Sequence, residues 1–225
     1  MSRNPQSRGI CAFCKEEFSK GGMRKHLELC PKRAFSISKT IGTPTETLWH
    51  LRVEDAYVKD FWLDLEMRGS YTLSILDEYL RAIWLECCGH LSEFTIGGFG
   101  GTEIAISRKA DSIFKTGLVL RHLYDYGTTS ETDIRVLDSR IGTPLSKHPI
   151  FLMSRNLQPK LKCQECNQPA VWLCMECLIE GDTKGTLCEK HVEDHPHTEY
   201  GEPIEIVNSP RVGMCGYEGP AEPPY

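Results

Sequence analysis

The sequence of 225 residues contains no run of about 18 apolar residues, the minimum that a membrane-spanning helix needs. It also lacks an apolar segment behind the polar, basic residues 1–8, where a secretory signal would carry one. We therefore expect a cytoplasmic protein with no membrane partner. Eleven cysteines in a chain without an export signal favour metal ligation in a reducing compartment over disulfides.

Motifs of common enzymes are also missing. The sequence has no HExxH, no P-loop and no spacing typical of a catalytic triad. The glycine cluster at residues 97–101 lacks both the Lys-Ser/Thr of a P-loop and the strand–GxGxxG–helix context of a nucleotide fold, so we interpret it as a hairpin loop. We assign no catalytic residue.

Acidic residues are scarce at the N-terminal end of the chain, and basic residues are scarce at the C-terminal end. Residues 1–40 hold nine Lys/Arg and three Asp/Glu, a balance of +6, whereas residues 163–225 hold three and twelve, a balance of −9. A basic head attracts phosphate and an acidic tail repels it. If the protein binds DNA or RNA, the contact is expected in residues 1–40.

Residues 1–40 have the outline of a zinc finger with basic flanks. Two cysteines, Cys11 and Cys14, have the spacing of a metal-binding knuckle, and His26 and Cys30 are four apart, so on a helix they share one face. Pro31 would end that helix.

This segment resembles Cys-Cys-His-Cys members of the zinc-finger family, with one residue fewer than usual between the second and third ligands. Phe18 and Met23 lie where such a finger has its apolar core. The resemblance implies that residues near the helix start touch bases or phosphates, here Lys20, Arg24 and Lys25. Contact with a protein instead of nucleic acid stays open.

Residues 45–158 predict an α+β body, which is a mostly antiparallel sheet with one main helix. A small zinc-binding module is expected on each side of it, in residues 1–40 and 160–217. The helix is expected from an N-cap at Thr72 toward a stop at Gly89, and residues 36–46 are interpreted as a linker. Strands are expected at 48–53, 60–67, 91–96, 118–126, 131–137 and 150–153.

Three segments of the body, YTLSILD at 71–77, HLSEFTIGG at 90–98 and YDYG at 124–127, carry a resemblance. Over roughly residues 47–153 the chain resembles the plasmid open-reading-frame-three family, whose members also occur as passengers of insertion elements. The resemblance implies a fold and a mobile-element context, and no established activity. The chain departs from the family's Asp, Trp and His at Thr128, Ser130 and Thr132.

Four polar residues of these segments are a candidate acid–base or metal site: His90, Glu93, Tyr124 and Asp125. We favour the simpler interpretation, that they are edge-strand and turn residues making ordinary hydrogen bonds. The adjacent Cys87 and Cys88 have no evident positive partner, so we interpret them as packed apolar residues without a chemical role.

Residues 160–217 hold a second ligand series: Cys163, Cys166, Cys174, Cys177, Cys188, His191, His195 and His197. The series resembles a B-box, which implies that the ligand pairs interleave. One zinc would be bound by Cys163, Cys166, Cys188 and His191, and a second by Cys174, Cys177, His195 and His197. A sequential alternative puts the first four cysteines on one zinc, and Cys215 is then a ligand of the other. Four protein ligands leave no open position, so either arrangement is structural.

We expect residues 207–217 to pack back on the protein and residues 218–225 to be loose.

These features predict a non-enzymatic interaction protein with about three structural zinc ions. Nucleic acid would be bound through residues 1–40 and protein through residues 163–217. The alternative is an enzyme acting on nucleic acid or a small substrate, with its site near His90, Glu93, Tyr124 and Asp125.

Overall fold

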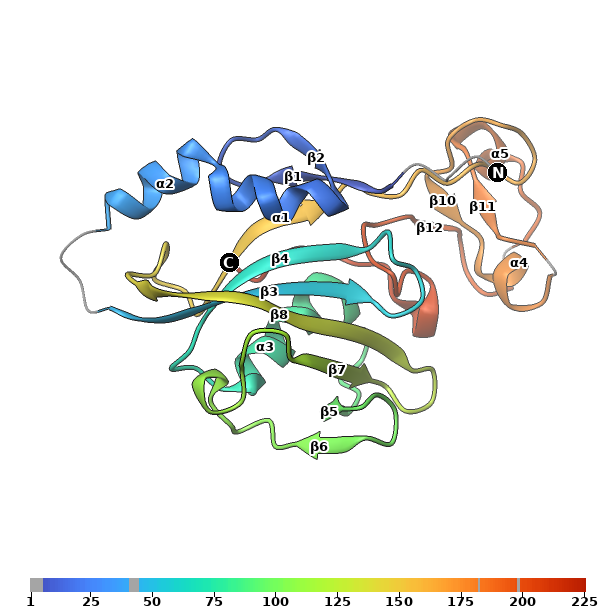
Figure 1. The fold of residues 1–225 in the computed structure, drawn as a ribbon. Coiled ribbons are helices and arrows are strands. Elements are labelled where there is room, and N and C mark those ends of the chain that lie inside the picture. The colour runs from blue at the N-terminus through green and yellow to red at the C-terminus, as the bar shows by residue number, and fades with distance from the viewer. Residues whose placement is uncertain (1–5, 41–44, 182, 198) are drawn as a thin grey trace, which may run out of the picture.

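The computed structural model describes residues 6–40, 45–181, 183–197 and 199–225 (Figure 1). Within these ranges nine strands form one sheet in the order β2-β1-β9-β4-β3-β8-β7-β5-β6, and three short strands form another in the order β11-β10-β12. Every pairing in both sheets is antiparallel. This is the α+β architecture that the sequence predicts.

The strands of the large sheet are β1 (Arg8–Cys11), β2 (Glu17–Ser19), β3 (Glu46–Asp55), β4 (Trp62–Arg68), β5 (Ser92–Ile96), β6 (Thr102–Ile104), β7 (Val119–Tyr124), β8 (Ser130–Gly142) and β9 (Ile150–Asn156). Those of the small sheet are β10 (Trp172–Leu173), β11 (Thr186–Leu187) and β12 (Ile204–Glu205). The helices are α1 (Lys20–Leu29), α2 (Pro31–Ser38), α3 (Leu73–Leu80), α4 (Met175–Ile179) and α5 (Glu189–Glu193), with the short turns η1 (Arg81–Leu85), η2 (Ala110–Ser112) and η3 (Met214–Gly216).

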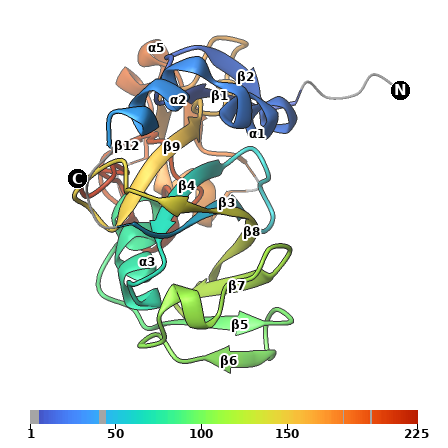
Figure 2. The ribbon, with the colours of Figure 1, turned by 60° about the vertical axis from the view of Figure 1, so that its left-hand side comes forward.

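The central strand β4 is buried on both of its faces. Leu63, Leu65 and Met67 point into the main core, which α3 covers, and this is the alternation that the sequence predicts. The alternate residue Trp62 points the other way and packs with Met153 against helix α1. In Figure 2 helix α1 lies on the opposite side of the sheet from α3. The sheet therefore separates two layers, α3 on one face and the N-terminal head on the other.

The head, residues 6–40, is continuous with the body because β1 pairs with β9, with Gly9 opposite Asn156. We had expected it to flank the body as a small separate module. Gly9 permits the close approach, since a Cβ there would lie 2.4 Å from the carbonyl oxygen of Arg155 and 2.6 Å from the Trp62 ring. A short β-strand of the finger is thus also a strand of the large sheet.

Most predicted elements of the body are confirmed, with shifted ends. Helix α3 has Thr72 at its N-cap, but the π-helical turn η1 follows it and the helical segment ends at Glu86, before Gly89. The glycine cluster 97–101 connects the antiparallel strands β5 and β6, as predicted for a hairpin loop.

The predicted linker is wrong at its start, because residues 36–38 belong to α2. Pro31 ends α1 as predicted, yet its fixed backbone also suits the first turn of a new helix, and α2 begins there. Residues 41–44 of the predicted linker lie outside the described residues.

The C-terminal segment packs on the body, as predicted for residues 207–217. The Asn156 side-chain amide donates to the Asn208 side-chain oxygen, and the Asn208 side-chain amide donates to the backbone carbonyl oxygen of Asn156. The Ser209 hydroxyl donates to the carbonyl oxygen of Trp84. The expectation of a loose end at 218–225 is wrong, since Ala221 is buried and the Tyr225 ring stacks on His148. Throughout the described ranges, no helix combines the length and the apolar character needed to cross a membrane.

A buried polar network lies between the sheet and the head. The Asp64 carboxylate, fully shielded from solvent, accepts hydrogen bonds from Arg52 at 2.9 and 3.0 Å, from His50 at 2.8 Å and from Ser154 at 2.8 Å. Burial by itself raises the pKa of Asp64, but the His50 and Arg52 interactions outweigh it and lower the pKa below its ordinary value. The network therefore keeps a charged carboxylate inside the protein.

We expect Asp64→Asn to lower the free energy of unfolding by about 3–5 kcal/mol at neutral pH, because the buried Arg52 loses its closest counter-ion and keeps only the 3.8 Å ion pair with Glu54. The folded pKa of Asp64 lies below its unfolded pKa, so its contribution is complete above the unfolded value and is lost as the pH falls through the folded one. Urea unfolding of both proteins from neutral to acid pH measures this. Asp60→Asn, at an exposed position, is the matched control, and an equal loss in both variants would contradict the network's role.

We expect Gly9→Ala to lower the free energy of unfolding by about 1–3 kcal/mol, because the added methyl group overlaps a backbone oxygen and the Trp62 ring. Chemical denaturation of metal-loaded protein measures the loss. Gly21→Ala in the same head is the control, since its Cβ would meet only the flexible Gln6 side chain. Equal stability of the two variants would show that the head does not dock closely on the sheet.

Candidate metal centres

The head brings together Cys11, Cys14, His26 and Cys30, as the finger spacing predicts. Cys11 ends β1, His26 lies on α1, and Cys30 follows that helix. The Cys14 Sγ lies 3.3 Å from the His26 Nε2. Burial raises the pKa of the Cys11 thiol to about 11, so a bound cation would have to displace its proton.

The core of the head is shared with the body. Met23 and Leu27 from α1 pack with Trp62 and Met153 of the sheet, and all four are buried. Met23 is the core residue that the sequence predicts, whereas Phe18 is only partly buried and stacks on the His26 ring at 3.7 Å. The candidate ligand His26 is thus held in place by the Phe18 ring and by helix α1, whose Met23 and Leu27 are buried.

The first cluster of the tail contains Cys163, Cys166, Cys188 and His191. The His191 Nδ1 lies 3.3 Å from the Cys163 Sγ and 3.6 Å from the Cys188 Sγ. Burial raises the pKa of the Cys163 thiol, but the His191 hydrogen bond and backbone N–H groups outweigh it and lower the pKa to about 6. A thiolate is thus already favoured at this position.

The second cluster of the tail contains Cys174, Cys177, His195 and His197. The Cys177 Sγ lies 3.3 Å from the His195 Nε2 and 3.1 Å from the His197 Nδ1. The side chains are therefore grouped in the interleaved order, and the sequential alternative does not match the structure. Cys215 belongs to neither tail cluster.

The distances suit one tetrahedral ion in each cluster. Metal–sulfur bonds of about 2.3 Å and metal–nitrogen bonds of about 2.0 Å separate two sulfurs by about 3.8 Å and a sulfur from a nitrogen by about 3.5 Å. The Cys166 and Cys188 sulfurs are 3.9 Å apart, far longer than a disulfide, and all eleven cysteines are free. Four ligands close each site, so these clusters can hold a structural ion and offer no position to a substrate.

A fourth cluster, which we did not predict, joins Cys87, Cys88, His90 and Cys215. Cys88 and Cys215 are 127 residues apart in the chain, yet their sulfurs are 3.8 Å apart. The sequence carried one signal for it, a histidine two residues after a cysteine pair. Nothing in the sequence connected that signal to Cys215.

Arg211 is the positive partner of Cys87 that the sequence does not reveal. Its fully buried guanidinium donates to the Asp125 carboxylate at 2.6 Å, to the Ser130 hydroxyl at 2.8 Å and to the Cys87 sulfur at 3.4 Å. Burial raises the pKa of Cys87, but the bonds with Arg211 and neighbouring groups outweigh it and lower the pKa to about 7. The expectation that Cys87 is only a packed apolar residue is therefore wrong.

Of the four candidate acid–base residues, His90 belongs to this fourth cluster, and Tyr124 and Asp125 lie beside it. The His90 Nε2 is 3.4 Å from the Asp125 carboxylate, and the buried Tyr124 hydroxyl donates to Glu86 at 3.1 Å. Glu93 interacts with the Tyr126 hydroxyl and raises its pKa, along with burial. Asp125 is already bound by Arg211 and by the backbone, so the residues that meet here are engaged in holding the structure.

The three cations expected to touch nucleic acid differ in their availability. Lys20 forms an ion pair with Glu54 at 3.1 Å and donates to a carbonyl oxygen of the body at 2.9 Å. Arg24 pairs with Glu28 at the surface, and Lys25 is exposed. The Lys20 side chain at the start of α1 is therefore turned toward the body, whereas Arg24 and Lys25 face solvent.

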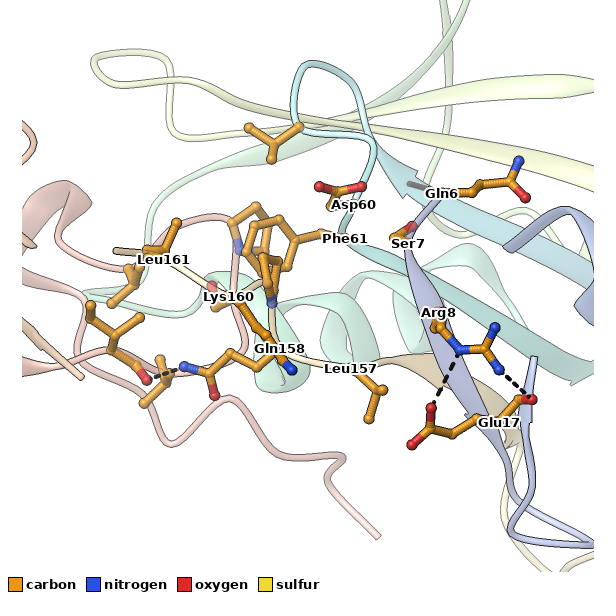
Figure 3. Close-up of a pocket in the computed structure, with 17 residues that line it drawn as sticks. Gln6, Ser7, Arg8, Glu17, Asp60, Phe61, Leu157, Gln158, Lys160 and Leu161 are labelled. Carbon is orange, nitrogen blue, oxygen red and sulfur yellow. Dashed lines mark hydrogen bonds and ion pairs between the residues drawn. The ribbon is translucent and has the colours of Figure 1, made fainter. Parts of the chain in front are cut away.

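A pocket of about 680 Å³ lies where head, body and tail meet (Figure 3). Arg8 and Glu17 line its head side, Phe61 and Leu157 its body side, and Ile206 its tail side. One side-chain amide, from Gln158, donates to the Ile206 carbonyl oxygen and ties the tail to the last body strand. The pocket is mostly apolar, and its charged groups include the solvent-exposed Arg8–Glu17 ion pair on the head side.

Comparison with known proteins adds little. No protein-family model matches the sequence, and no curated protein matches it either. Among solved structures the chain is similar to MM3350, a protein of unknown function from Methanosarcina mazei Go1, at 17% identity and a TM-score of 0.40. The similarity spans 46% of this chain and 66% of that one. A likeness of this extent says nothing about activity.

We expect His197→Ala to remove one metal ion per chain from the zinc-loaded protein, because it takes a ligand from the second tail cluster alone. Elemental analysis after desalting measures the loss. His148→Ala is the matched control, since within the described residues His148 belongs to no such cluster. An unchanged metal content in His197→Ala would exclude His197 as a ligand.

Proposed function

We propose that this protein is a non-enzymatic interaction protein, folded in part by zinc, which binds nucleic acid through its head and protein through its tail. The observation that carries the proposal is the surface formed by the outer turns of α1 and by α2. Helix α2 buries none of its residues and projects beyond the sheet (Figure 1). A helix that contributes nothing to the core is available to a partner.

The exposed side chains of this surface suit a phosphate backbone. Four cations lie on it: Arg24, Lys25, Lys32 and Lys39. Two large apolar side chains accompany them, Leu29 at 70% and Phe35 at 60% exposure, and the Lys39 ammonium lies 4.2 Å from the Phe35 ring centre. Cations next to an exposed aromatic ring are typical of surfaces that bind single strands through phosphates and stacked bases.

The contact we propose is independent of base sequence. Base reading by a finger uses the start of its helix, and here Lys20 at that start is engaged with Glu54 of the body. The remaining cations are spread along α1 and α2 and so suit phosphates better than base edges. We therefore move the expected contact from Lys20 to the exposed cations.

The tail offers a surface of opposite character. Residues 163–225 carry a balance of −9, which disfavours phosphate. Helix α4 exposes Leu178 and Ile179 next to the acidic Glu176 and Glu180. A protein partner with basic and apolar side chains would complement this surface. Zinc suits the ligand sets of the chain because thiolate and imidazole are its usual structural ligands.

We also propose that the body is related to the plasmid open-reading-frame-three family and thus to mobile elements. Support comes from the HLSEFTIGG and YDYG segments, which lie side by side in the structure since Ser92 of β5 pairs with Tyr124 of β7. The enzyme alternative has weaker support, because Tyr124 and Asp125 are buried and already bonded.

Fluorescence anisotropy with labelled single-stranded DNA and RNA, over a series of salt concentrations, tests the nucleic-acid contact. We expect binding whose logarithm falls linearly with the logarithm of salt concentration. Combined replacement of Lys25, Lys32 and Lys39 by Ala should weaken it for all sequences and reduce the slope by roughly two to three, at about 0.7–0.9 for each lost phosphate contact.

The matched control replaces three exposed lysines of the body by Ala: Lys109, Lys115 and Lys147. It makes the same change in net charge and should leave affinity and slope nearly unchanged. Removing residues 6–40 is a poor test, because it would expose Trp62 and Met153 of the sheet. Equal weakening by both triple variants, or no binding at low salt, would contradict the proposal.

A further inference from the structure

The fourth Cys/His cluster differs from the other three in what it connects. Each of the other clusters takes its ligands from one stretch of the chain, whereas this one takes Cys87, Cys88 and His90 from the body and Cys215 from the C-terminal segment. The three body ligands follow directly after the helical segment that ends at Glu86. An ion held here would tie two separately formed parts of the fold together.

The ligand atoms are already arranged around one point. The His90 Nε2 lies 3.0 Å from the Cys88 sulfur and 3.4 Å from the Cys215 sulfur, and the Cys87 sulfur lies 3.7 Å from that of Cys88. These separations are close to those of a tetrahedral ion with three thiolates and one imidazole, about 3.8 Å between sulfurs and about 3.5 Å from sulfur to nitrogen.

Backbone geometry supports a built site rather than a chance encounter. Cys215 has a left-handed backbone, with φ of 52°, and lies between Gly213 and Gly216, which also have positive φ. Non-glycine residues adopt this conformation at a cost, and it persists where surrounding structure requires it. Here the turn η3 points the thiol of Cys215 toward Cys88 and His90.

The charges around the cluster also fit a metal thiolate. Three thiolates, a neutral imidazole and a divalent ion together carry one net negative charge. The fully buried guanidinium of Arg211 lies next to this charge, 3.4 Å from the Cys87 sulfur. Second-layer hydrogen bonds of this kind orient ligands and stabilise the charged complex. Arg211 also binds Asp125, so the residue that anchors the C-terminal segment touches both the cluster and the body.

We propose that Cys87, Cys88, His90 and Cys215 bind a zinc ion that clamps the C-terminal segment onto the body, and that this ion is the most exchangeable in the protein. Cys88 and Cys215 are the exposed cysteines of the chain, whereas each of the other clusters has at least two buried cysteines. A chelator therefore reaches this ion first. Its removal frees residues 207–217 while the head and tail clusters stay loaded. The clamp is independent of the proposed nucleic-acid contact.

Metal content tests the site. Full-length protein loaded with zinc and desalted should hold about four ions, one for each cluster, and Cys215→Ser and Cys88→Ser should each hold one fewer. Both positions are exposed, so the variants should fold. His148→Ala is the control, because His148 also contacts the C-terminal end, through Tyr225, but is not a ligand. Three ions in the unmodified protein, or an unchanged content in the variants, would overturn the site.

Hydrogen exchange tests the clamp. With zinc bound, amides of residues 207–217 should be protected, and limited chelation that removes one ion should increase their exchange while α1 stays protected. Cys215→Ser should show the faster exchange without chelation, and His148→Ala should not. Equal exchange of this segment with and without the ion would overturn the clamp, as would a Cys88–Cys215 disulfide in a non-reducing peptide map of freshly purified protein.

Discussion

The clustering of cysteine and histidine side chains at both ends of this molecule, positioned to bind metal ions, is the constraint that bears most on how those ends fold. The tail has strands of two residues and helices of five, and its apolar clusters contain only a few buried side chains, such as Leu173 and Leu187. A core of that size cannot offset the entropy of ordering the chain. A structural zinc ion in a small finger contributes about 10–16 kcal/mol, which is enough to do so.

The body has a large apolar core that contains none of the candidate metal clusters of the two ends. The head and the C-terminal segment pack against this body. Strand β4 contributes apolar side chains to the α3 layer and Trp62 and Asp64 to the head layer, so one strand serves two interfaces. The two interfaces differ in character. The α3 side is a continuous apolar core. The head side includes the Asp64 carboxylate, which accepts four hydrogen bonds, and these bonds specify one arrangement of the packed strands.

Local interactions also engage the candidate acid–base residues of the body. Thr128 and Ser130, two of the positions where the chain departs from the family it resembles, bind Arg211 of the C-terminal segment. Arg211 then pairs with Asp125, which leaves that carboxylate without a free role. The C-terminal segment thus docks at the candidate acid–base site, and His90 of that site belongs to the fourth Cys/His cluster.

Sequence alone predicted the main helix and the strands of the body apart from β6, and it identified the ligands of three Cys/His clusters, although it left the grouping of the tail ligands open. Both rest on local patterns: alternation of apolar residues places strands such as β4, and pairs of ligands two or four residues apart share a knuckle or a helix face. These signals need no knowledge of distant residues, because the periodicity of a strand or helix is set by neighbouring backbone angles.

Only the tertiary structure decided the pairing of β1 with β9, the engagement of Lys20 by Glu54, and the meeting of Cys88 with Cys215. Each contact joins residues far apart in the chain, and many other partners would satisfy the same local pattern. The choice among them is made by packing of the whole sheet, which places the end of β9 beside the head and the helix end beside η3. A pair of adjacent cysteines is therefore uninformative until the fold brings a third one to it.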